Sequence, residues 1–210
     1  MYEVYGMPRT RTTRVVWALE ELEVDYAYHL VDLLKGEGQR PEYLRMNPSG
    51  KVPVLVDGDL VLSESAAICA YLGDKYPERL LVPRCGTVER AKYDQWSYFV
   101  LTELEQPLWT AFKHRFVYPA EMRVPAILEV APREFGRAAA LLARGLEGKD
   151  YLVGDKFTLA DLLAAHTLVW ARGLKIPHGQ AGLEDYEQRI CSRPAFARMR
   201  ARETHETGRT

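Results

Sequence analysis

The feature that most constrains this chain is a proline, Pro53, at the entrance of a short apolar strand. The strand is the first arm of a predicted hairpin, because β-branched runs at 52–56 and 60–62 flank the turn sequence Asp57-Gly58-Asp59. A proline gives up one hydrogen bond of the sheet ladder, so it belongs at an edge or at the first position of a strand. The backbone N–H and C=O of Val52 can then pair with an extended peptide. The alternative is an edge strand in which proline only prevents aggregation.

The segment after the hairpin changes from a strand period to a helical one. Apolar residues recur at helical spacing from residue 66 to residue 72, and Ser63, Glu64 and Ser65 stand at the start of this predicted helix. The free N–H groups and the positive dipole end of a helix N-terminus attract a carboxylate. Glu64 can therefore hold the ammonium of an amino-acid head group while Ser65 and the helix amides hold its carboxylate. The alternative role for these residues is plain helix capping.

The sequence G-K-V-P-V-L, followed by L-S-E-S-A-A-I-C-A-Y-L, resembles the glutathione-binding signature of the cytosolic glutathione transferases. In that family the residue before the proline pairs with the cysteinyl backbone of glutathione, and the peptide bond into the proline is cis. The acid and serine of the family motif hold the γ-glutamyl head. The resemblance assigns these roles to Val52, Pro53, Glu64 and Ser65, and it extends over nearly the whole chain.

The N-terminal part of the chain has an order of elements that fits this resemblance. Strand, helix and strand patterns fill the first 33 residues, and a short helix near 41–46 precedes the hairpin and the next helix. The βαβ-ββα order is the α/β thioredoxin-like arrangement that the resemblance also implies. We place a thioredoxin-like, glutathione-binding domain at 1–77, a linker at 78–86 and an all-α C-terminal helical domain at 87–210.

The helical domain begins with one long amphipathic pattern. Helical spacing from Val88 to about Phe116 predicts a helix that bends near Pro107, and Pro132 leads into a helix over 133–145.

A capping signal lies deeper in this domain. Thr158, followed three residues later by Asp161, approximates a capping box, and the family carries the same motif as a folding element. We assign both residues a structural role. Ser192-Arg193-Pro194 starts a short last helix, and the polar tail from about Glu203 is expected to fray.

The loop between the first strand and the first helix carries the candidate chemistry. The family activates the glutathione thiol with a tyrosine at the end of the first strand or with a serine or cysteine in the loop that follows. Tyr5 matches the tyrosine position, and Thr10 matches the serine position of the bacterial-type, theta-like classes. One charge-assisted hydrogen bond, about 1.5 to 3 kcal/mol, suffices to lower a thiol pKa by about two units. We favour Thr10 as this donor, with Tyr5, Thr12 or backbone amides as alternatives; otherwise Thr10 is an N-cap and Tyr5 a core aromatic.

Further residues complete the predicted site. Lys51 can reach the glycine carboxylate of glutathione as a point charge, and Gln39 lies where some relatives place another contact to that end. In the family the second substrate lies in an apolar pocket between the thiol and the long helix. Trp109 and Phe112 are our first choices for this pocket among the aromatic residues of that helix, most of which belong to the core.

The composition argues against several other classes of protein. There are 28 Lys and Arg residues against 29 acids, so no global field favours nucleic acid or an anionic membrane. No apolar run approaches the roughly 20 residues of a membrane span, and the N-terminus lacks signal-peptide features. The three cysteines have no C-x-x-C spacing and the five histidines no metal-ligand spacing. We expect a cytoplasmic protein with no metal, no membrane and no nucleic-acid partner.

These observations lead to one prediction and two alternatives. The prediction is a homodimeric glutathione transferase of detoxification type that uses glutathione as co-substrate and attacks an apolar electrophile. The first alternative is a glutathione-dependent disulfide reductase or peroxidase on the same fold. The second is a non-catalytic, transferase-like module that binds a ligand or a protein.

Overall fold

The computed structural model describes residues 1–208 and divides into two compact units. The first unit comprises Met1–Val82 together with Ser192–Thr210, and the second comprises Pro83–Cys191. The sequence-based division placed 192–210 in the helical domain, whereas the contacts of the structure group this segment with the N-terminal part of the chain.

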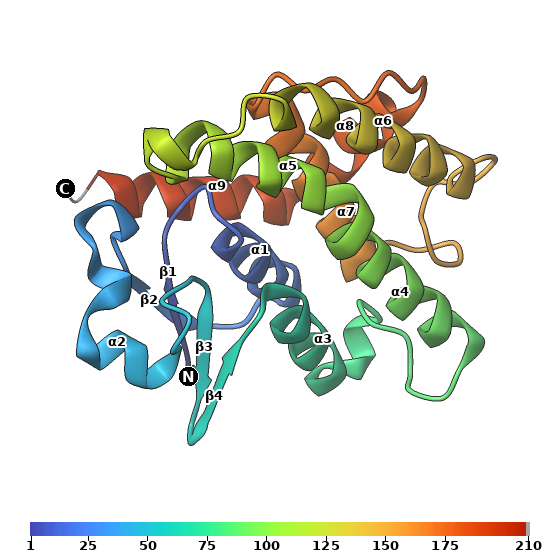
Figure 1. The fold of residues 1–210 in the computed structure, drawn as a ribbon. Helices are drawn as coiled ribbons and strands as arrows, with labels where there is room; N and C mark the ends of the chain where they lie inside the picture. The colour runs from blue at the N-terminus through green and yellow to red at the C-terminus, as the bar shows by residue number, and fades with distance from the viewer. Residues whose placement is uncertain (209–210) are drawn as a thin grey trace. The chain divides into compact units, whose positions relative to one another are not determined.

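The first unit is built on a four-stranded mixed sheet (Figure 1). The strands are β1 (Tyr2–Gly6), β2 (Tyr26–Leu30), β3 (Val54–Asp57) and β4 (Leu60–Ser63), in the order β2-β1-β3-β4. β1 is parallel to β2 and antiparallel to β3, and β3 is antiparallel to β4. The predicted βαβ-ββα order is thereby confirmed.

Helices cover both faces of this sheet. The alternation of β1 buries Tyr2, Val4 and Gly6 on one face, where α1 (Thr12–Leu22) packs against α3 (Ser65–Lys75). The other face carries a second apolar cluster, which includes Tyr43 of the short helix α2 (Pro41–Met46). At the end of β1, Gly6 is required by packing, because a Cβ there would lie 2.1 Å from Cγ2 of Thr12. The start of α1 can therefore approach the strand closely.

The C-terminal helix α9 (Pro194–Thr207) packs on α1, as Figure 1 shows. Arg193 binds both carboxylate oxygens of Glu21 at 2.7 Å, and Arg198 Nε lies 3.0 Å from Glu20 Oε2. The prediction of a short helix with a frayed tail from Glu203 is wrong for the described part of the chain. The helix reaches Thr207, and its acidic residues Glu203 and Glu206, which a local pattern would leave in solvent, are buried within the first unit.

The second unit begins with a continuous helical path that contains two π turns. It runs through α4 (Val88–Phe99), the π turn Val100–Leu104, α5 (Glu105–Phe112) and the π turn Lys113–Val117. Pro107 has no N–H for a bond to the carbonyl four residues before it, and the first π turn ends just before this position. The long helix predicted from Val88 to about Phe116 is present, with its irregularity at residues 100–104.

The remaining helices of this unit are α6 (Ile127–Gly145), α7 (Leu159–Gly173) and α8 (Leu183–Cys191). The start predicted for α6, after Pro132, is wrong: the helix begins at Ile127 and contains this proline. Its first turn is held by bonds from the N–H groups of residues 128–130 to carbonyls three or four residues earlier, at 2.9 to 3.2 Å. Short 3-10 turns occupy Leu33–Lys35, Glu37–Gln39, Pro77–Arg79 and Ala120–Met122.

The capping motif before α7 is a buried hydrogen-bond centre. Asp161 accepts hydrogen bonds from the backbone N–H of Thr158 (2.8 Å), the hydroxyl of Thr158 (3.0 Å), the N–H of Leu152 (2.8 Å) and the hydroxyl of Tyr186 (2.9 Å). The structural role predicted for Thr158 and Asp161 is confirmed. No helix within residues 1–208 is long and apolar enough to cross a membrane.

Candidate active site

Val52 enters the sheet with its backbone polar groups unused. The peptide bond from Val52 to Pro53 is cis, as the resemblance implies. The sheet ladder starts one residue later, at Val54, which pairs with Tyr5 and Ser63. Among residues 1–208, no hydrogen bond engages the N–H or C=O of Val52. This position can therefore pair with an extended peptide.

The residues around Val52 hold it in place. Its side chain packs in the apolar cluster with Tyr43 and Val54. The preceding carbonyl, that of Lys51, accepts hydrogen bonds from the hydroxyl of Tyr43 and from Nδ2 of Asn47, both at 2.7 Å. The backbone on the entry side of Val52 is thus anchored before any ligand binds.

Glu64 stands in an unusual backbone conformation at the start of α3. Its φ is +68° and its ψ 106°, in a region that L-residues rarely adopt. Its carbonyl accepts the first helical bond, from the N–H of Ile68 at 3.0 Å. The exposed carboxylate has no partner among the side chains that the structure describes. Backbone strain of this kind costs about 1 to 3 kcal/mol and is typical of ligand-binding positions.

Ser65 begins α3 and lies against a buried arginine. Its side chain is buried, and its Oγ accepts a hydrogen bond from Nη1 of Arg14 at 3.4 Å. Arg14 lies on α1 and is itself fully buried. A charged residue in an amphipathic helix is usually solvent-exposed, whereas the structure places Arg14 inside the unit.

Cys69 lies one helical turn after Ser65 and belongs to the core. Its Sγ lies 3.7 Å from the carbonyl oxygen of Arg14, and complete burial raises the pKa of this thiol to about 12. A thiol with so high a pKa is a poor nucleophile at neutral pH.

Thr10 is half-exposed in the loop before α1. Its hydroxyl donates to the carbonyl of Met7 at 2.6 Å and lies 3.0 Å from Oγ1 of Thr12. Its oxygen accepts from the N–H of Thr12 at 3.2 Å, and its carbonyl accepts from the N–H of Thr13 at 3.1 Å. Thr10 thus precedes Arg11, the N-cap of α1, and keeps part of its side chain accessible.

The two side-chain alternatives to Thr10, Tyr5 and Thr12, form other hydrogen bonds. Thr12 is fully buried, and its Oγ1 accepts from the N–H of Met7 at 3.2 Å. The hydroxyl of Tyr5 donates to Oε2 of Glu3 at 2.8 Å, and its ring stacks on His29 with centroids 4.5 Å apart. Burial, followed by the hydrogen bond to Glu3, raises the pKa of Tyr5.

Gln39 lies against Gly50, the residue that directly precedes Lys51. Gly50 has φ +65°, and a Cβ added to this glycine would lie 2.2 Å from Nε2 of Gln39. Both Gln39 and Lys51 are exposed. The structure thus brings together two residues that the sequence assigned to the same end of glutathione.

Trp109 and Phe112 belong to an aromatic group within the second unit. Their rings stack with centroids 5.9 Å apart, and Phe112 also contacts Phe116 at 5.1 Å and Trp170 of α7 at 6.0 Å. Both are half-buried. Trp170 was not among the predicted pocket residues, because no periodicity within α5 indicates a contact with α7.

A further residue that the sequence did not indicate is Glu203 of α9. Its Oε1 accepts from the N–H of Arg9 at 3.1 Å and from the hydroxyl of Thr13. These partners lie 194 and 190 residues away in the chain, so no local pattern could connect them.

Comparison with known proteins identifies the family. The model of the glutathione S-transferase N-terminal domain matches residues 1–74, and that of the C-terminal domain matches residues 105–194. Glutathione S-transferase F10 of Arabidopsis thaliana is 32% identical over 210 residues, which cover 95% of this chain and 96% of the plant protein. The chain belongs to the glutathione S-transferase family.

Two further similar proteins are a disulfide-bond oxidoreductase and a glutathione transferase of known structure. Disulfide-bond oxidoreductase YfcG of Escherichia coli (strain K12) is 32% identical over 203 residues, 93% of this chain and 92% of the bacterial protein. The crystal structure of glutathione transferase URE2P8 from Phanerochaete chrysosporium with oxidized glutathione has a TM-score of 0.88 at 25% identity and covers 100% of this chain and 97% of that one. The family confirms the predicted fold and makes this chain a glutathione transferase with glutathione as its co-substrate.

Proposed function

We propose that this transferase joins glutathione to an apolar electrophile through attack of the glutathione thiolate. The observation that carries the proposal is that two polar groups make no hydrogen bond in the described structure. They are the backbone of Val52 and the carboxylate of Glu64. The first suits the peptide backbone of glutathione, and the second suits the ammonium of its γ-glutamyl head. Ser65 and the N-terminal amides of α3 receive the carboxylate of that head, while Lys51 and Gln39 face the glycine end.

Thr10 is the proposed donor to the thiolate. In the structure its hydroxyl donates to the carbonyl of Met7, and rotation about χ1 exchanges that neutral hydrogen bond for one to an anionic sulfur. A hydrogen bond to a charged group is worth about 1.5 to 3 kcal/mol, more than a neutral one. The exchange therefore favours the thiolate. The burial of Thr12 and the bond from Tyr5 to Glu3 leave Thr10 as the best placed of the three candidates.

The reaction itself needs no group beyond glutathione and its acceptor. The thiol proton leaves to solvent, the sulfur forms a bond to an electrophilic carbon, and the leaving group departs with the electron pair of its own bond. The protein supplies thiolate stabilisation and proximity. Trp109 and Phe112 are the proposed apolar contacts for the acceptor.

Three broader properties belong to the same proposal. A two-fold dimer is the expected assembly, since closed symmetric dimers are the commonest form of soluble oligomer. Detoxification of apolar electrophiles is the expected role, and the cytoplasm is the expected compartment.

A second candidate function is reduction of disulfides by glutathione. The name of the Escherichia coli relative, Disulfide-bond oxidoreductase YfcG, favours it. In this case the same thiolate attacks a sulfur of a mixed disulfide, and a thiolate leaves. Activity on a mixed disulfide or an organic hydroperoxide, with none on an aryl halide, would support it over conjugation.

The deciding experiment is a pH titration of bound glutathione followed by thiolate absorbance in the ultraviolet. We expect the bound thiol to ionise well below the usual thiol pKa of about 8.5, and Thr10→Ala to reverse most of that shift. Thr10→Ser is the matched control, because it keeps the hydroxyl. A wild-type protein that binds glutathione without lowering its thiol pKa would point to a non-catalytic binding module. A protein that binds no glutathione would overturn the roles of Val52, Glu64 and Ser65.

A further inference from the structure

The loop that carries Thr10 is tied to the C-terminal helix through one carboxylate. Glu203 of α9 is 4% exposed, and its Oε1 accepts from the backbone N–H of Arg9 at 3.1 Å and from the hydroxyl of Thr13. Arg9 directly precedes Thr10, and Thr13 follows it by three residues. The carboxylate thus holds the backbone on one side of Thr10 and the first turn of α1 on the other.

The backbone that Glu203 holds at Arg9 has an uncommon conformation. Arg9 has φ +60°, in the left-handed region that residues with a Cβ rarely occupy. Thr13 in turn donates its N–H to the carbonyl of Thr10 at 3.1 Å, which closes the first turn around Thr10. Losing the carboxylate would free both ends of this turn, and the direction of the Thr10 side chain follows from the backbone between them.

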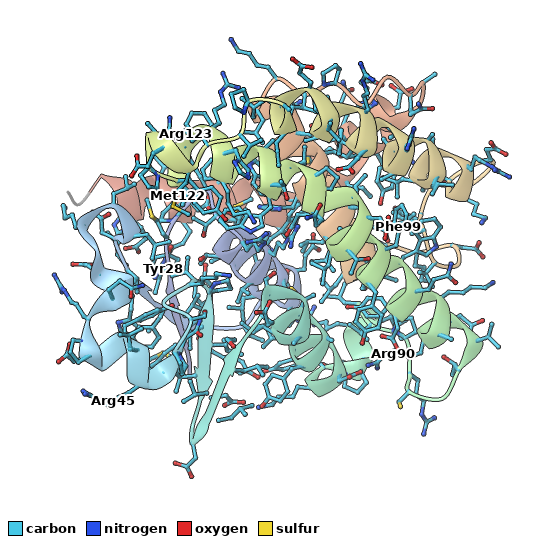
Figure 2. All side chains as sticks on the ribbon, in the orientation of Figure 1. Tyr28, Arg45, Arg90, Phe99, Met122 and Arg123 are labelled. Atoms are coloured by element: carbon cyan, nitrogen blue, oxygen red, sulfur yellow. The ribbon has the colours of Figure 1, made fainter. Side chains whose placement is uncertain are left out.

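Arg200 and Tyr28 are charged or titratable neighbours of Glu203. Arg200, on the same helix, places Nη1 3.8 Å from Oε2 of Glu203. Tyr28, which lies on β2 and is labelled in Figure 2, is close enough that its pKa is raised by burial and then by the carboxylates of Glu203 and Glu206. Charged and titratable neighbours of Glu203 thus include Arg200 of α9 and Tyr28 of β2.

We propose that Glu203 is a positioning residue, which aims the hydroxyl of Thr10 at the glutathione thiolate by fixing Arg9 and Thr13. This inference rests on the proposed role of Thr10. It assigns a part in thiol activation to the last helix of the chain, distant in sequence from every residue of the glutathione signature. Glu203 acts through Thr10, so its loss weakens thiolate stabilisation while glutathione still binds at Val52, Glu64 and Ser65.

The test measures the pKa of bound glutathione thiol and the dissociation constant of glutathione in variants of the whole chain. We expect Glu203→Ala to raise the bound thiol pKa by about one unit, to lower kcat several-fold and to change the dissociation constant less than twofold. Glu203→Gln retains an acceptor oxygen and should restore most of the effect. Thr13→Val, which removes one donor with little change of shape, should give a smaller shift in the same direction.

A matched control and a double variant separate positioning from general stability. Glu206→Gln alters a buried acid of the same helix that pairs with Arg202 at 3.3 Å, whereas the bonds to Arg9 and Thr13 come from Glu203. It should leave the thiol pKa unchanged. Adding Glu203→Ala to Thr10→Ala should cause no further shift, because the group that Glu203 positions is already absent. An unchanged thiol pKa in Glu203→Ala, or an equal shift in Glu206→Gln, would overturn the proposal.

Amide hydrogen exchange distinguishes failure of this inference from failure of the proposed function. If wild-type protein does not lower the thiol pKa, the role of Thr10 fails and with it the positioning role in catalysis. Exchange at the Arg9 amide would then report only whether Glu203 holds Arg9. Faster exchange at Arg9 in Glu203→Ala together with a normal thiol shift would show that Glu203 holds the loop but does not position Thr10.

Discussion

Nη1 of Arg14 on α1 donates to Oγ of Ser65 at the start of α3, 3.4 Å away, with both side chains buried. The contact connects the helix that begins beside Thr10 with the helix that begins beside Glu64. An arginine keeps its charge inside a protein, so Arg14 makes the potential beside Ser65 more positive and favours the binding of an anion there. The carboxylate of a γ-glutamyl head at Ser65 would supply one.

Replacement of Ser65 by alanine should weaken glutathione binding by about five- to tenfold, or about 1 to 1.4 kcal/mol, the value of one hydrogen bond. The bound thiol pKa should stay as in wild type, because the thiol belongs to the central cysteinyl residue and not to the γ-glutamyl head that Ser65 would hold. Calorimetric titration measures the first quantity and ultraviolet absorbance the second. Ser63→Ala is the control, and equal losses in the two variants would contradict a specific role for Ser65.

Replacement of Glu64 should separate stability from binding. Glu64→Gly relieves the positive φ and should raise the free energy of unfolding by about 1 kcal/mol while glutathione affinity falls. Glu64→Gln keeps the strained backbone and removes the charge, so affinity should fall about tenfold with stability unchanged. Urea unfolding and calorimetric titration check both. Wild-type affinity in Glu64→Gln would exclude an ammonium contact at this residue.

Replacement of Asp161 should destabilise the second unit strongly. The carboxylate accepts from four donors, and an asparagine would turn its NH2 group toward some of them. We expect Asp161→Asn to lower the free energy of unfolding by about 3 kcal/mol, nearly as much as Asp161→Ala, because a buried donor is left facing a donor. Asp155, exposed just before α7, provides the control Asp155→Asn. A thermal melt that shows little loss in Asp161→Asn would contradict this account.

Asp57 should give the first unit a dependence on acid. The pKa of Asp57 lies below its usual 3.8. The larger cause is the hydrogen bond from Lys75, and the next is the hydrogen bond from the hydroxyl of Tyr71 at 2.6 Å. A carboxyl with a lowered folded pKa stabilises the fold above its unfolded pKa, and that contribution disappears as pH falls through the folded value. Wild type should therefore lose stability relative to Asp57→Asn below about pH 4.

The difference at neutral pH should be small, below about 1 kcal/mol, since the pair is partly solvated. Urea unfolding from pH 6 down to pH 2.5 provides the measurement. A constant difference between wild type and Asp57→Asn across this range would show that the Lys75 pair has no linkage to folding.

Replacement of Trp109 or Phe112 by alanine should impair use of the apolar acceptor without affecting glutathione. Loss of an aromatic contact of this size is worth about 1 to 2 kcal/mol, so kcat/KM for an aryl halide should fall roughly five- to thirtyfold. The dissociation constant of glutathione and the bound thiol pKa should not change. Tyr98, on α4 and 66% exposed, provides the control Tyr98→Ala. A loss confined to glutathione affinity would remove both residues from the acceptor pocket.

Much of the N-terminal unit could be predicted because its signals are local. The turn at 57–59, the period change after residue 62 and the proline at the strand entrance each act within a few residues, and the strands and helices lie where these patterns placed them. The same holds for the capping residue Thr158. The start of α6 could not be predicted in this way, because a proline in the second turn of a helix resembles a proline at its first position.

The sequence by itself determined the βαβ-ββα order of the first unit, since turn chemistry and hydrophobic period depend on near neighbours, and the family resemblance supplied the candidate residues for glutathione. Only the tertiary structure decided that Arg14 is buried, that the hydroxyl of Tyr5 bonds to Glu3, and that α9 continues through Glu203 to Thr207. It also decided that Glu203 holds the loop around Thr10. The physical reason is that a charged side chain reads as solvent-exposed in any local pattern, and the distant donors and acceptors that permit its burial meet only when the chain has folded.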